Sequence, residues 1–311
     1  MKMKVLVTGG AGYVGTSLVP QLLDEGYDVR VLDDLSMGGA QLLPFFAHKN
    51  FEFMKGDVTK REDITKAVKD VDAIIALAGI VGYPACRKFP ELSRKINVYA
   101  TQLLCEVAPK EVPILFASSG STYGKLIGDL CTETSPLNPL TDYGKQKAES
   151  EQILLERGNV VIYRFATAYG ISPRLRLDLM PNDFTYKAVK DRTLIVYEKN
   201  FNRTFIHVRD MGRSFVFALK NLNKMKDEIY NVGDNDQNLT KEQMCLLIKK
   251  HVDYYLHFAD TGKDFDQRDY MVSYAKIERL GFKPKITIEE GVVEMVKAFE
   301  VVEVKSPYHN V

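Results

Sequence analysis

The sequence contains no tryptophan and only four cysteines among its 311 residues. The cysteines, Cys86, Cys105, Cys131 and Cys245, form no Cys-x-x-Cys pair, and no histidine stands near them at a spacing that suits zinc. A disulfide-stapled scaffold is therefore excluded as an interpretation. We expect reduced structural thiols and no metal site.

A dominant charge is also missing, because 42 basic residues face 41 acidic ones and leave a net charge of +1. Without a basic stripe, nucleic acid is not an expected partner, and an anionic ligand must be held locally. No apolar run approaches the ~18 residues of a membrane span, and residues 5–8 lead straight into glycines instead of a secretory signal core. We expect a cytoplasmic protein with no membrane partner.

Short apolar runs alternate with longer stretches of helical periodicity. The strand-like runs are residues 4–8, 28–33, 51–54, 73–76, 114–117 and 160–163, and the main helical stretches between them are 12–25, 61–69, 92–107 and 143–157. This alternation predicts an α/β protein with a Rossmann-type, doubly wound parallel sheet. We assign residues 1–171 to a nucleotide-binding domain, with 204–235 returning to it, and residues 172–203 and 236–311 to a smaller substrate lobe.

A glycine-rich turn follows the first expected strand. Gly9, Gly12 and Gly15 flank Tyr13 and Val14 at the start of a helix, where backbone amides suit a pyrophosphate. Eighteen residues after Gly15, Asp33 ends the second expected strand, close to the ~20 residues expected for a carboxylate that binds the adenosine ribose. Asp33, or its neighbour Asp34, therefore favours NAD over NADP.

A tyrosine and a lysine four residues apart, Tyr143 and Lys147, begin another helix and share one face of it. A phenol of pKa ~10 is a poor base at neutral pH, so a nearby ammonium must stabilise its phenolate. Tyr186 and Lys190 repeat the spacing, but only Tyr143 follows a strand that ends in serines, Ser118 and Ser119, at the ligand-binding edge of the sheet.

These motifs together resemble the extended short-chain dehydrogenases, the NAD-dependent epimerase/dehydratase family. Almost the whole chain takes part, through the glycine loop, Asp33, Asp57-Val58, Leu77-Ala78-Gly79, Asn97, Ser119, Tyr143, Lys147 and the 203–208 run Arg-Thr-Phe-Ile-His-Val. The resemblance implies NAD as cofactor, with Asn97 and Phe165 also beside it. It implies that Tyr143 is the general base, that Lys147 lowers its pKa, and that Ser119, with Ser118 as runner-up, binds the reacting hydroxyl at C4 of a sugar.

The same resemblance implies a nucleotide-sugar substrate. It places Arg203 and Arg268 on the diphosphate, although either arginine could instead be a surface ion-pair partner, and it places Thr167, Arg174 and Asn182 near the substrate. Residues 171–179 and 182–186 resemble a subgroup that oxidises GDP-heptose at C4 in capsule biosynthesis, so a GDP-sugar is favoured. Helices 92–107 and 143–157 carry apolar residues on more than one face, which fits a homodimer, as in many relatives, or a core role alone.

Three other functions differ from this oxidation in the residues that they require. A 4,6-dehydratase of this family has an Asp-Glu pair after the serine, where this chain has Gly120 and Ser121, so elimination of water lacks its acid and base. A 4-epimerase needs the same three catalytic residues and stays the close alternative, although Thr167 replaces an asparagine usual in UDP-galactose epimerases. A catalytically silent NAD-binding protein usually has a broken triad, whereas here all three residues are present.

Overall fold

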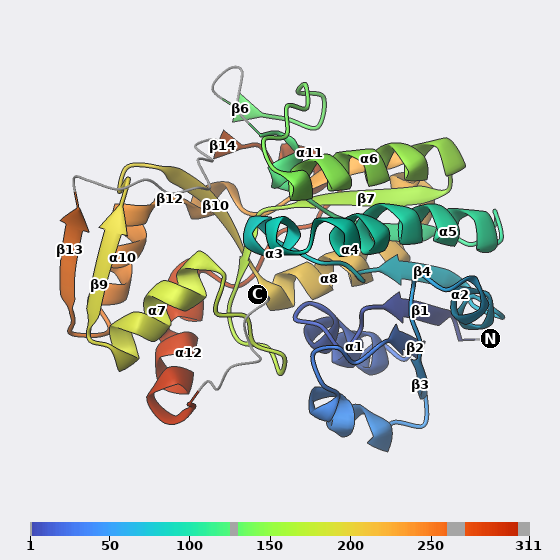
Figure 1. Cartoon of the computed structure of the whole chain (residues 1–311), viewed down its shortest axis with the longest axis horizontal. Coiled ribbons are helices and arrows are strands. Elements are labelled where there is room, and N and C mark those ends of the chain that lie inside the picture. Colours follow the sequence, from blue (N-terminus) through green and yellow to red (C-terminus); the bar gives the residue numbers. More distant parts are fainter. Residues whose placement is uncertain (1, 125–129, 260–270, 304–311) are drawn as a thin grey trace.

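The computed structural model describes residues 2–124, 130–259 and 271–303. Its centre is a seven-stranded sheet in the order β11-β7-β5-β4-β1-β2-β3, and every neighbouring pair is parallel (Figure 1). The strands are β1 (Lys4–Thr8), β2 (Asp28–Asp33), β3 (Phe51–Lys55), β4 (Ala73–Ala76), β5 (Ile114–Ser119), β7 (Val160–Phe165) and β11 (Glu228–Val232). The predicted doubly wound α/β fold is confirmed.

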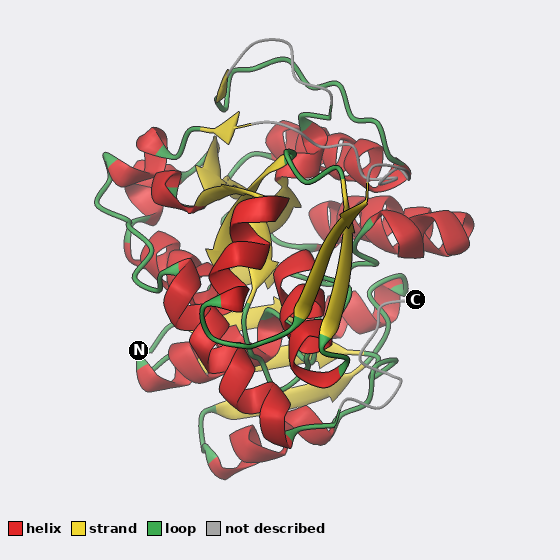
Figure 2. Cartoon of the chain, turned by 90° about the vertical axis from the view of Figure 1, so that its left-hand side faces the viewer, coloured by secondary structure: helices red, strands yellow, loops and turns green. Residues whose placement is uncertain are grey.

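Helices cover both faces of this sheet because residues along each buried strand point alternately to the two sides. Figure 2 shows helices on either side of the sheet strands. On β1, Val5 and Val7 belong to the core beneath one helix layer, whereas Leu6 belongs to the core beneath the other. One layer holds α1 (Gly15–Asp24) and α8 (Val208–Lys220). The other holds α2 (Arg61–Ala67), α5 (Ala100–Val107) and α6 (Asp142–Arg157). The short α3 (Tyr83–Lys88) and α4 (Pro90–Arg94) lie between α2 and α5 in the chain.

The predicted helix 92–107 is interrupted. A π-helical turn at Lys95–Tyr99 separates α4 from α5 and carries Asn97, whose carbonyl accepts hydrogen bonds from the hydroxyls of Thr101 and Ser150. Such turns give one carbonyl and one side chain directions that a regular helix does not allow. The interruption therefore points the Asn97 amide towards the loop after β4.

A second lobe lies at the left of Figure 1, with its own core around Phe205, Met244 and Phe299. Its helices are α7 (Met180–Lys190), α10 (Lys241–Lys249) and α12 (Ile288–Val301), beside the paired strands β9 (Thr193–Tyr197) and β13 (Tyr255–Ala259). Between the lobes, β10 (Asn202–His207) pairs with β8 (Thr167–Tyr169) and β12 (Asn238–Thr240). The shorter elements are η1 (Ala40–Ala47), η3 (Gly120–Thr122), β6 (Leu130–Cys131), α9 (Leu222–Met225), η4 (Asn235–Gln237), β14 (Met271–Val272) and α11 (Ala275–Glu278).

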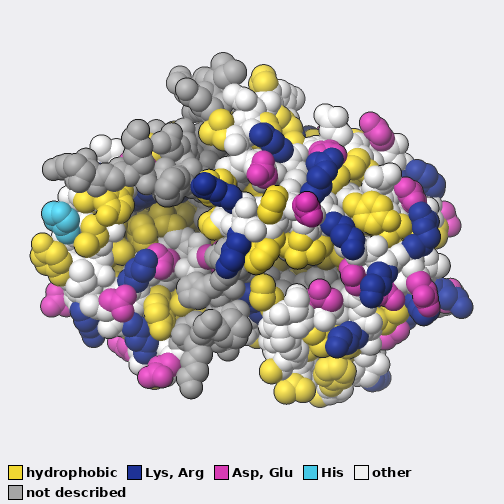
Figure 3. All heavy atoms as spheres, in the orientation of Figure 1, with side chains coloured by type: hydrophobic (Ala, Val, Ile, Leu, Met, Phe, Trp, Pro, Cys, Tyr) yellow, Lys and Arg dark blue, Asp and Glu magenta, His cyan; other side chains and the backbone are white. Residues whose placement is uncertain are grey.

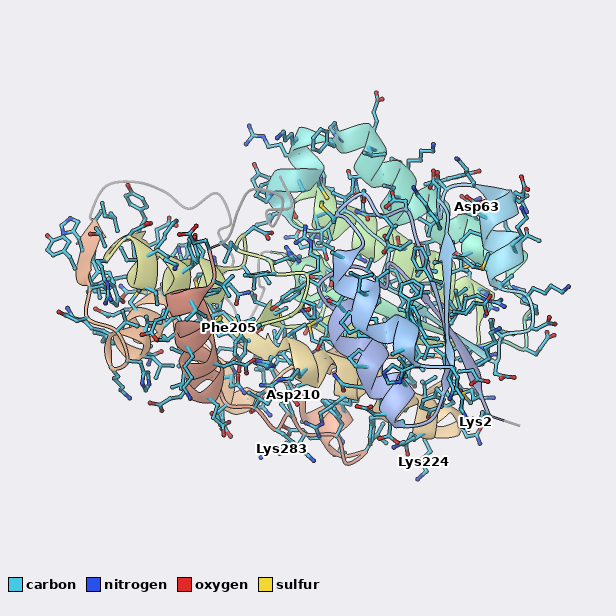
Figure 4. All side chains as sticks on the ribbon, turned by 90° about the horizontal axis from the view of Figure 1, so that it is seen from below. Lys2, Asp63, Phe205, Asp210, Lys224 and Lys283 are labelled. Carbon is cyan, nitrogen blue, oxygen red and sulfur yellow. The ribbon has the colours of Figure 1, made fainter. Side chains whose placement is uncertain are left out.

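The joint between the lobes is held by a buried carboxylate. Asp210, labelled with Phe205 in Figure 4, accepts hydrogen bonds from the backbone amides of Lys285 at 3.1 Å and Ile286 at 2.9 Å. Because α8 follows β10 directly, this contact ties the end of the second lobe to the helix layer of the first. The exact boundaries proposed for the lobes, at residues 171, 203 and 235, stay a prediction.

Basic and acidic side chains are intermixed over the face that Figure 3 shows, and neither sign gathers into a patch. Among the helices of the described ranges, none has both the length and the apolar character needed to cross a membrane.

Candidate active site

A cavity of about 650 Å³ opens where the carboxyl ends of β1, β2, β4 and β5 meet the chain that follows β8. Such an edge is the usual ligand site of an open α/β sheet. Most of the predicted site residues line it, namely Gly9, Gly12, Tyr13, Val14, Gly15, Asp33, Asp34, Asp57, Val58, Leu77, Ala78, Gly79, Ser119, Tyr143, Lys147, Phe165, Thr167 and Arg174. One continuous space therefore joins the expected cofactor and substrate regions.

The glycine loop is tight because β1 turns directly against the end of β4. Gly9 has a φ of +71°, and a Cβ built on it would lie 2.6 Å from the backbone nitrogen of Ala78. Any other residue would be strained and would clash there. The close packing holds residues 12–15, which line the cavity, at the start of α1, where helix amides suit an anion.

Asp33 is built into this loop, whereas Asp34 is not. Asp33 accepts hydrogen bonds from the backbone amides of Ala11 at 3.0 Å and Leu35 at 2.9 Å. Burial raises the pKa of the Asp33 carboxyl, and these two amides oppose that rise. Asp34 is more exposed, and its carboxylate accepts a hydrogen bond from Ser36 in its own turn at 2.8 Å. The geometry therefore favours Asp33 as the ribose ligand.

Lys147 lies in the floor of the cavity and is 3% exposed. Its ammonium donates to the carbonyl of Ala117 at 2.7 Å and stands 4.4 Å from the ring centre of Phe116. Burial lowers the pKa of Lys147 to about 8, and the nearby Glu151 carboxylate opposes that shift. The lysine is thus cationic at neutral pH, one helical turn from Tyr143, which lines the same cavity.

The two serines at the end of β5 have different surroundings. The hydroxyl of Ser119 donates to the Ser121 hydroxyl at 3.1 Å, and its oxygen accepts from the Ser121 amide at 3.1 Å. Ser118 instead donates to the buried carboxylate of Glu151 and is 4% exposed. At Ser119 a ligand hydroxyl competes only with the hydrogen bonds of a local turn. Ser119 is therefore the better candidate for binding the reacting hydroxyl.

Three of the described residues that were predicted for the site do not line the main cavity. Asn97 is 2% exposed, and its side-chain amide both donates to and accepts from the backbone of Ile80, at 2.9 Å each. Asn182 is fully buried and bonds to the backbone of Gly170 and Arg176. Both asparagines support cavity-lining segments from behind. Arg203 lines a neighbouring space of about 40 Å³ together with Ser119 and Thr167, and Arg268 lies outside the described residues.

The cavity also contains an arginine that the sequence argument did not single out. Arg176 lines it and forms two hydrogen bonds to Asp178, from Nε to Oδ1 at 3.0 Å and from Nη2 to Oδ2 at 2.5 Å. The run 171–179 contains this residue, but a run of sequence does not say which of its side chains points inward. Arg176 is therefore a further candidate for contact with the substrate.

Known proteins resemble this chain along nearly its full length. The sequence profile of the "NAD dependent epimerase/dehydratase family" matches residues 5–233. A UDP-glucose 4-epimerase from Bacillus subtilis is 30% identical over 322 residues, which span 93% of this chain and 94% of that protein. The match therefore includes the glycine loop, the serine-ended strand and the Tyr143 helix.

Two solved structures have closely similar folds. A UDP-glucose 4-epimerase from Thermotoga maritima, crystallised with UDP-glucose, has a TM-score of 0.85 and 25% identity, covering 96% of this chain and 98% of that one. A dTDP-glucose 4,6-dehydratase from Streptomyces venezuelae, crystallised with NAD, has a TM-score of 0.84 and 28% identity, covering 95% and 96%. The second lobe is thus included in the likeness, as well as the parallel sheet.

Proposed function

This chain belongs to the NAD-dependent epimerase/dehydratase family, and we propose that it oxidises the C4 hydroxyl of a nucleotide-activated sugar. The observation that carries the proposal is the meeting of Ser119, Tyr143 and Lys147 with the glycine loop in one cavity. Our first choice of substrate is a GDP-activated heptose, in the cytoplasm and in the service of capsule or surface-glycan synthesis. This choice rests on the resemblance of residues 171–179 and 182–186.

The residues present fit NAD. The glycine loop offers amides to a pyrophosphate, and Asp33 offers a carboxylate to the adenosine ribose. Asp57, Val58 and Leu77 line the same region. When bound, NAD accepts the hydride that leaves the sugar carbon, and this hydride acceptance is the chemistry that the protein's own side chains cannot supply.

The protein's side chains would move the proton. The Ser119 hydroxyl would hold the sugar hydroxyl, and the Tyr143 phenolate would remove its proton. The Lys147 ammonium would stabilise the phenolate, since a cation close to a phenol favours its ionised form. Arg203 and Arg268 would hold the diphosphate, because guanidinium groups match phosphate oxygens, and Arg174 would lie near the substrate. The carbonyl of the product forms as the carbon–hydrogen bond is broken.

Elimination of water is disfavoured by the distribution of carboxylates. Among the described residues that line the cavity, the acidic ones are Asp33, Asp34 and Asp57, all at the ends of β2 and β3. Gly120 and Ser121 follow Ser119. A dehydratase needs an acid and a base beside C5 and C6 of the sugar, so oxidation alone fits the catalytic end better.

A 4-epimerase is the second candidate, and the relative from Bacillus subtilis, a UDP-glucose 4-epimerase, favours it. Epimerisation begins with the same oxidation and then returns the hydride to the other face of the keto sugar. Thr167, in place of the usual asparagine, and the 171–179 run favour the dehydrogenase with a GDP-sugar. The two activities differ in the mass of the product.

The test is incubation with GDP-, UDP- and dTDP-sugars, followed by mass spectrometry and absorbance at 340 nm. A loss of two daltons supports net oxidation, an unchanged mass with altered retention supports epimerisation, and a loss of eighteen daltons contradicts both. If no nucleotide sugar changes and no NADH forms, the protein is a silent NAD-binding protein, and the proposal is wrong.

We also propose that the protein forms a homodimer. Leu92, Tyr99 and Leu155 are exposed large apolar residues on α4, the π-helical turn and α6, which belong to the same helix layer. A second copy of this layer would cover them. Light scattering on the purified protein, with Tyr99→Glu as the disrupting variant, tests this assembly; a monomer at micromolar concentration contradicts it.

A further inference from the structure

Buried hydroxyl groups join the glycine loop to the segment that lines the sugar end of the cavity. Thr16 on α1 is 1% exposed, and Ser172, beyond β8, is 4% exposed. Their hydroxyl oxygens are 2.7 Å apart, although 156 positions separate them in the chain. Neither hydroxyl takes part in the proposed oxidation. What they do is connect the glycine loop to the segment that lines the sugar end of the cavity.

Two orientations of the hydroxyls use only the shorter hydrogen bonds, since the remaining contact, from Thr16 to the Tyr13 carbonyl, is 3.4 Å long. In the first, Ser172 donates to the Tyr13 carbonyl at 2.7 Å, so Thr16 must donate to Ser172. In the second, Thr16 donates to the Gly12 carbonyl at 2.9 Å, and Ser172 donates to Thr16. Each hydroxyl has one hydrogen to give, so the two orientations exclude each other.

The Tyr13 carbonyl connects this choice to the cofactor. It belongs to the same trans peptide unit as the Val14 amide, and the two groups point in opposite directions. A pyrophosphate on the Val14 amide would polarise the peptide and make the carbonyl a better acceptor. Occupancy of the loop therefore favours the first orientation.

The hydrogen-bonded hydroxyls of Ser172 and Thr16 form a relay, and its other end reaches an arginine that lines the cavity. The backbone amide of Arg174 donates to the Thr16 oxygen at 3.4 Å, a long hydrogen bond. In the first orientation, that oxygen accepts only this amide, whereas in the second it also accepts from Ser172. The Arg174 contact therefore strengthens when the loop is occupied.

A second link runs parallel to the relay. The Tyr13 hydroxyl donates to the Gly170 carbonyl at 2.8 Å, and burial raises its pKa well above the ordinary value, so it stays a protonated donor. Asn182 accepts from the Gly170 amide at 2.9 Å and donates to the Arg176 carbonyl at 2.8 Å. The backbones of both cavity arginines are thus anchored to the glycine loop.

We propose that Tyr13, Thr16 and Ser172 are positioning residues that transmit occupancy of the pyrophosphate site to Arg174 and Arg176, so that cofactor binding raises the affinity for the nucleotide sugar. This inference rests on the proposed function for the identity of the second ligand. Linkage requires the reverse effect as well, so the sugar would raise the affinity for the cofactor by the same factor.

The test uses ADP, which ends at the pyrophosphate and cannot touch a bound sugar. Calorimetry of UDP-glucose and GDP-mannose binding to cofactor-free protein is done with and without saturating ADP. We expect ADP to tighten binding by about fivefold or more in the wild type and by less than about twofold in Ser172→Ala. Ser172→Thr, which keeps the hydroxyl, should restore the effect.

The matched control is Thr185→Val. Thr185 is a fully buried hydroxyl that bonds to the Pro181 carbonyl of its own helix at 2.7 Å, so its loss should leave the ADP effect intact. An unchanged ADP effect in Ser172→Ala, or no ADP effect in the wild type, overturns the inference.

Hydrogen exchange gives a readout that is independent of the sugar. ADP should slow exchange of the amides of residues 172 and 174–176 in the wild type but not in Ser172→Ala, and equal slowing in both overturns the relay. If no nucleotide sugar binds even with NAD, the proposed function is wrong, while the exchange result still decides whether the relay exists.

Discussion

Arg164 and Glu151 form a buried ion pair directly beneath the end of β5. Arg164 Nη2 lies 2.7 Å from one oxygen of Glu151, and Nε lies 3.1 Å from each of the two. The side chains are 4% and 2% exposed. The Ser118 hydroxyl also donates to the carboxylate, and Lys147 lies one turn earlier on α6. This pair therefore holds the strand end and the helix that together carry the catalytic residues.

Removing one partner of this ion pair should strongly destabilise the folded protein. We expect Glu151→Gln to lower the free energy of unfolding by about 3–5 kcal/mol, because it leaves a buried guanidinium without its counter-charge. Urea denaturation of the cofactor-free protein measures the change. The control is Glu106→Gln, which breaks an exposed pair with Arg61 and should cost no more than about 1 kcal/mol. Equal losses in the two variants would show that the buried pair has no special role.

Tyr143→Phe should abolish turnover while NAD remains bound. The substitution removes the only atom of the ring that accepts a proton, and loss of a general base lowers rates by about 10²–10⁴-fold. NADH formation and NAD titration measure the two effects separately. Tyr186→Phe is the matched control, since Tyr186 has the same spacing to a lysine but packs against Phe299 with 5.3 Å between ring centres. Turnover that survives in Tyr143→Phe refutes the assigned base.

The activity should fall on the alkaline side because Lys147 loses its charge. Burial lowers its pKa to about 8, so below pH 8 the ammonium is present and stabilises the phenolate, and above pH 8 it is progressively lost. We expect kcat/KM to decline from about pH 8, since this ratio reports groups of the free enzyme. Lys147→Arg, whose cation persists above pH 12, should be slower but without this decline. A wild-type profile that stays flat to pH 10 contradicts the assignment.

The order of strands and the position of the glycine loop were predictable because both depend on local patterns. The end of β7 was predicted two residues short, at position 163, because Arg164 is polar. Arg164 remains in the ladder because β7 pairs with β5 there, and the Glu151 carboxylate bonds to its side chain. A strand end that depends on a distant partner leaves no periodic signal.

The residues at the substrate end of the site were harder to predict from the sequence. Asn182 was predicted to touch substrate, yet it is buried behind the wall, whereas Arg176 lines the cavity. Arg176 lies in the 171–179 run and Asn182 in the 182–186 run, and both runs suggested substrate contact. The direction of each side chain is set by contacts with Gly170 and Asp178, which depend on the fold of the whole segment. Sequence spacing carries no information about those contacts.

Asp33→Ser and Asp34→Ser should distinguish the two adjacent candidates for the ribose ligand. Asp33 is held by the Ala11 amide of the glycine loop and by the Leu35 amide of its own turn, so its carboxylate is fixed at the cavity wall, whereas Asp34 is tied only to its own turn. A hydrogen bond to a charged group contributes about 1.5–3 kcal/mol, so Asp33→Ser should weaken NADH binding by about 10–100-fold. Asp34→Ser should change it by less than about threefold.

The same variants test cofactor choice, because a carboxylate at the ribose repels the 2′-phosphate of NADPH. Fluorescence titration with NADH and NADPH should show that Asp33→Ser narrows the preference for NADH, while Asp34→Ser preserves it. If Asp34→Ser causes the larger loss, the ribose ligand is Asp34. The role of Asp33 would then be limited to supporting the backbone of Ala11 and Leu35, since those two hydrogen bonds would be its remaining contacts.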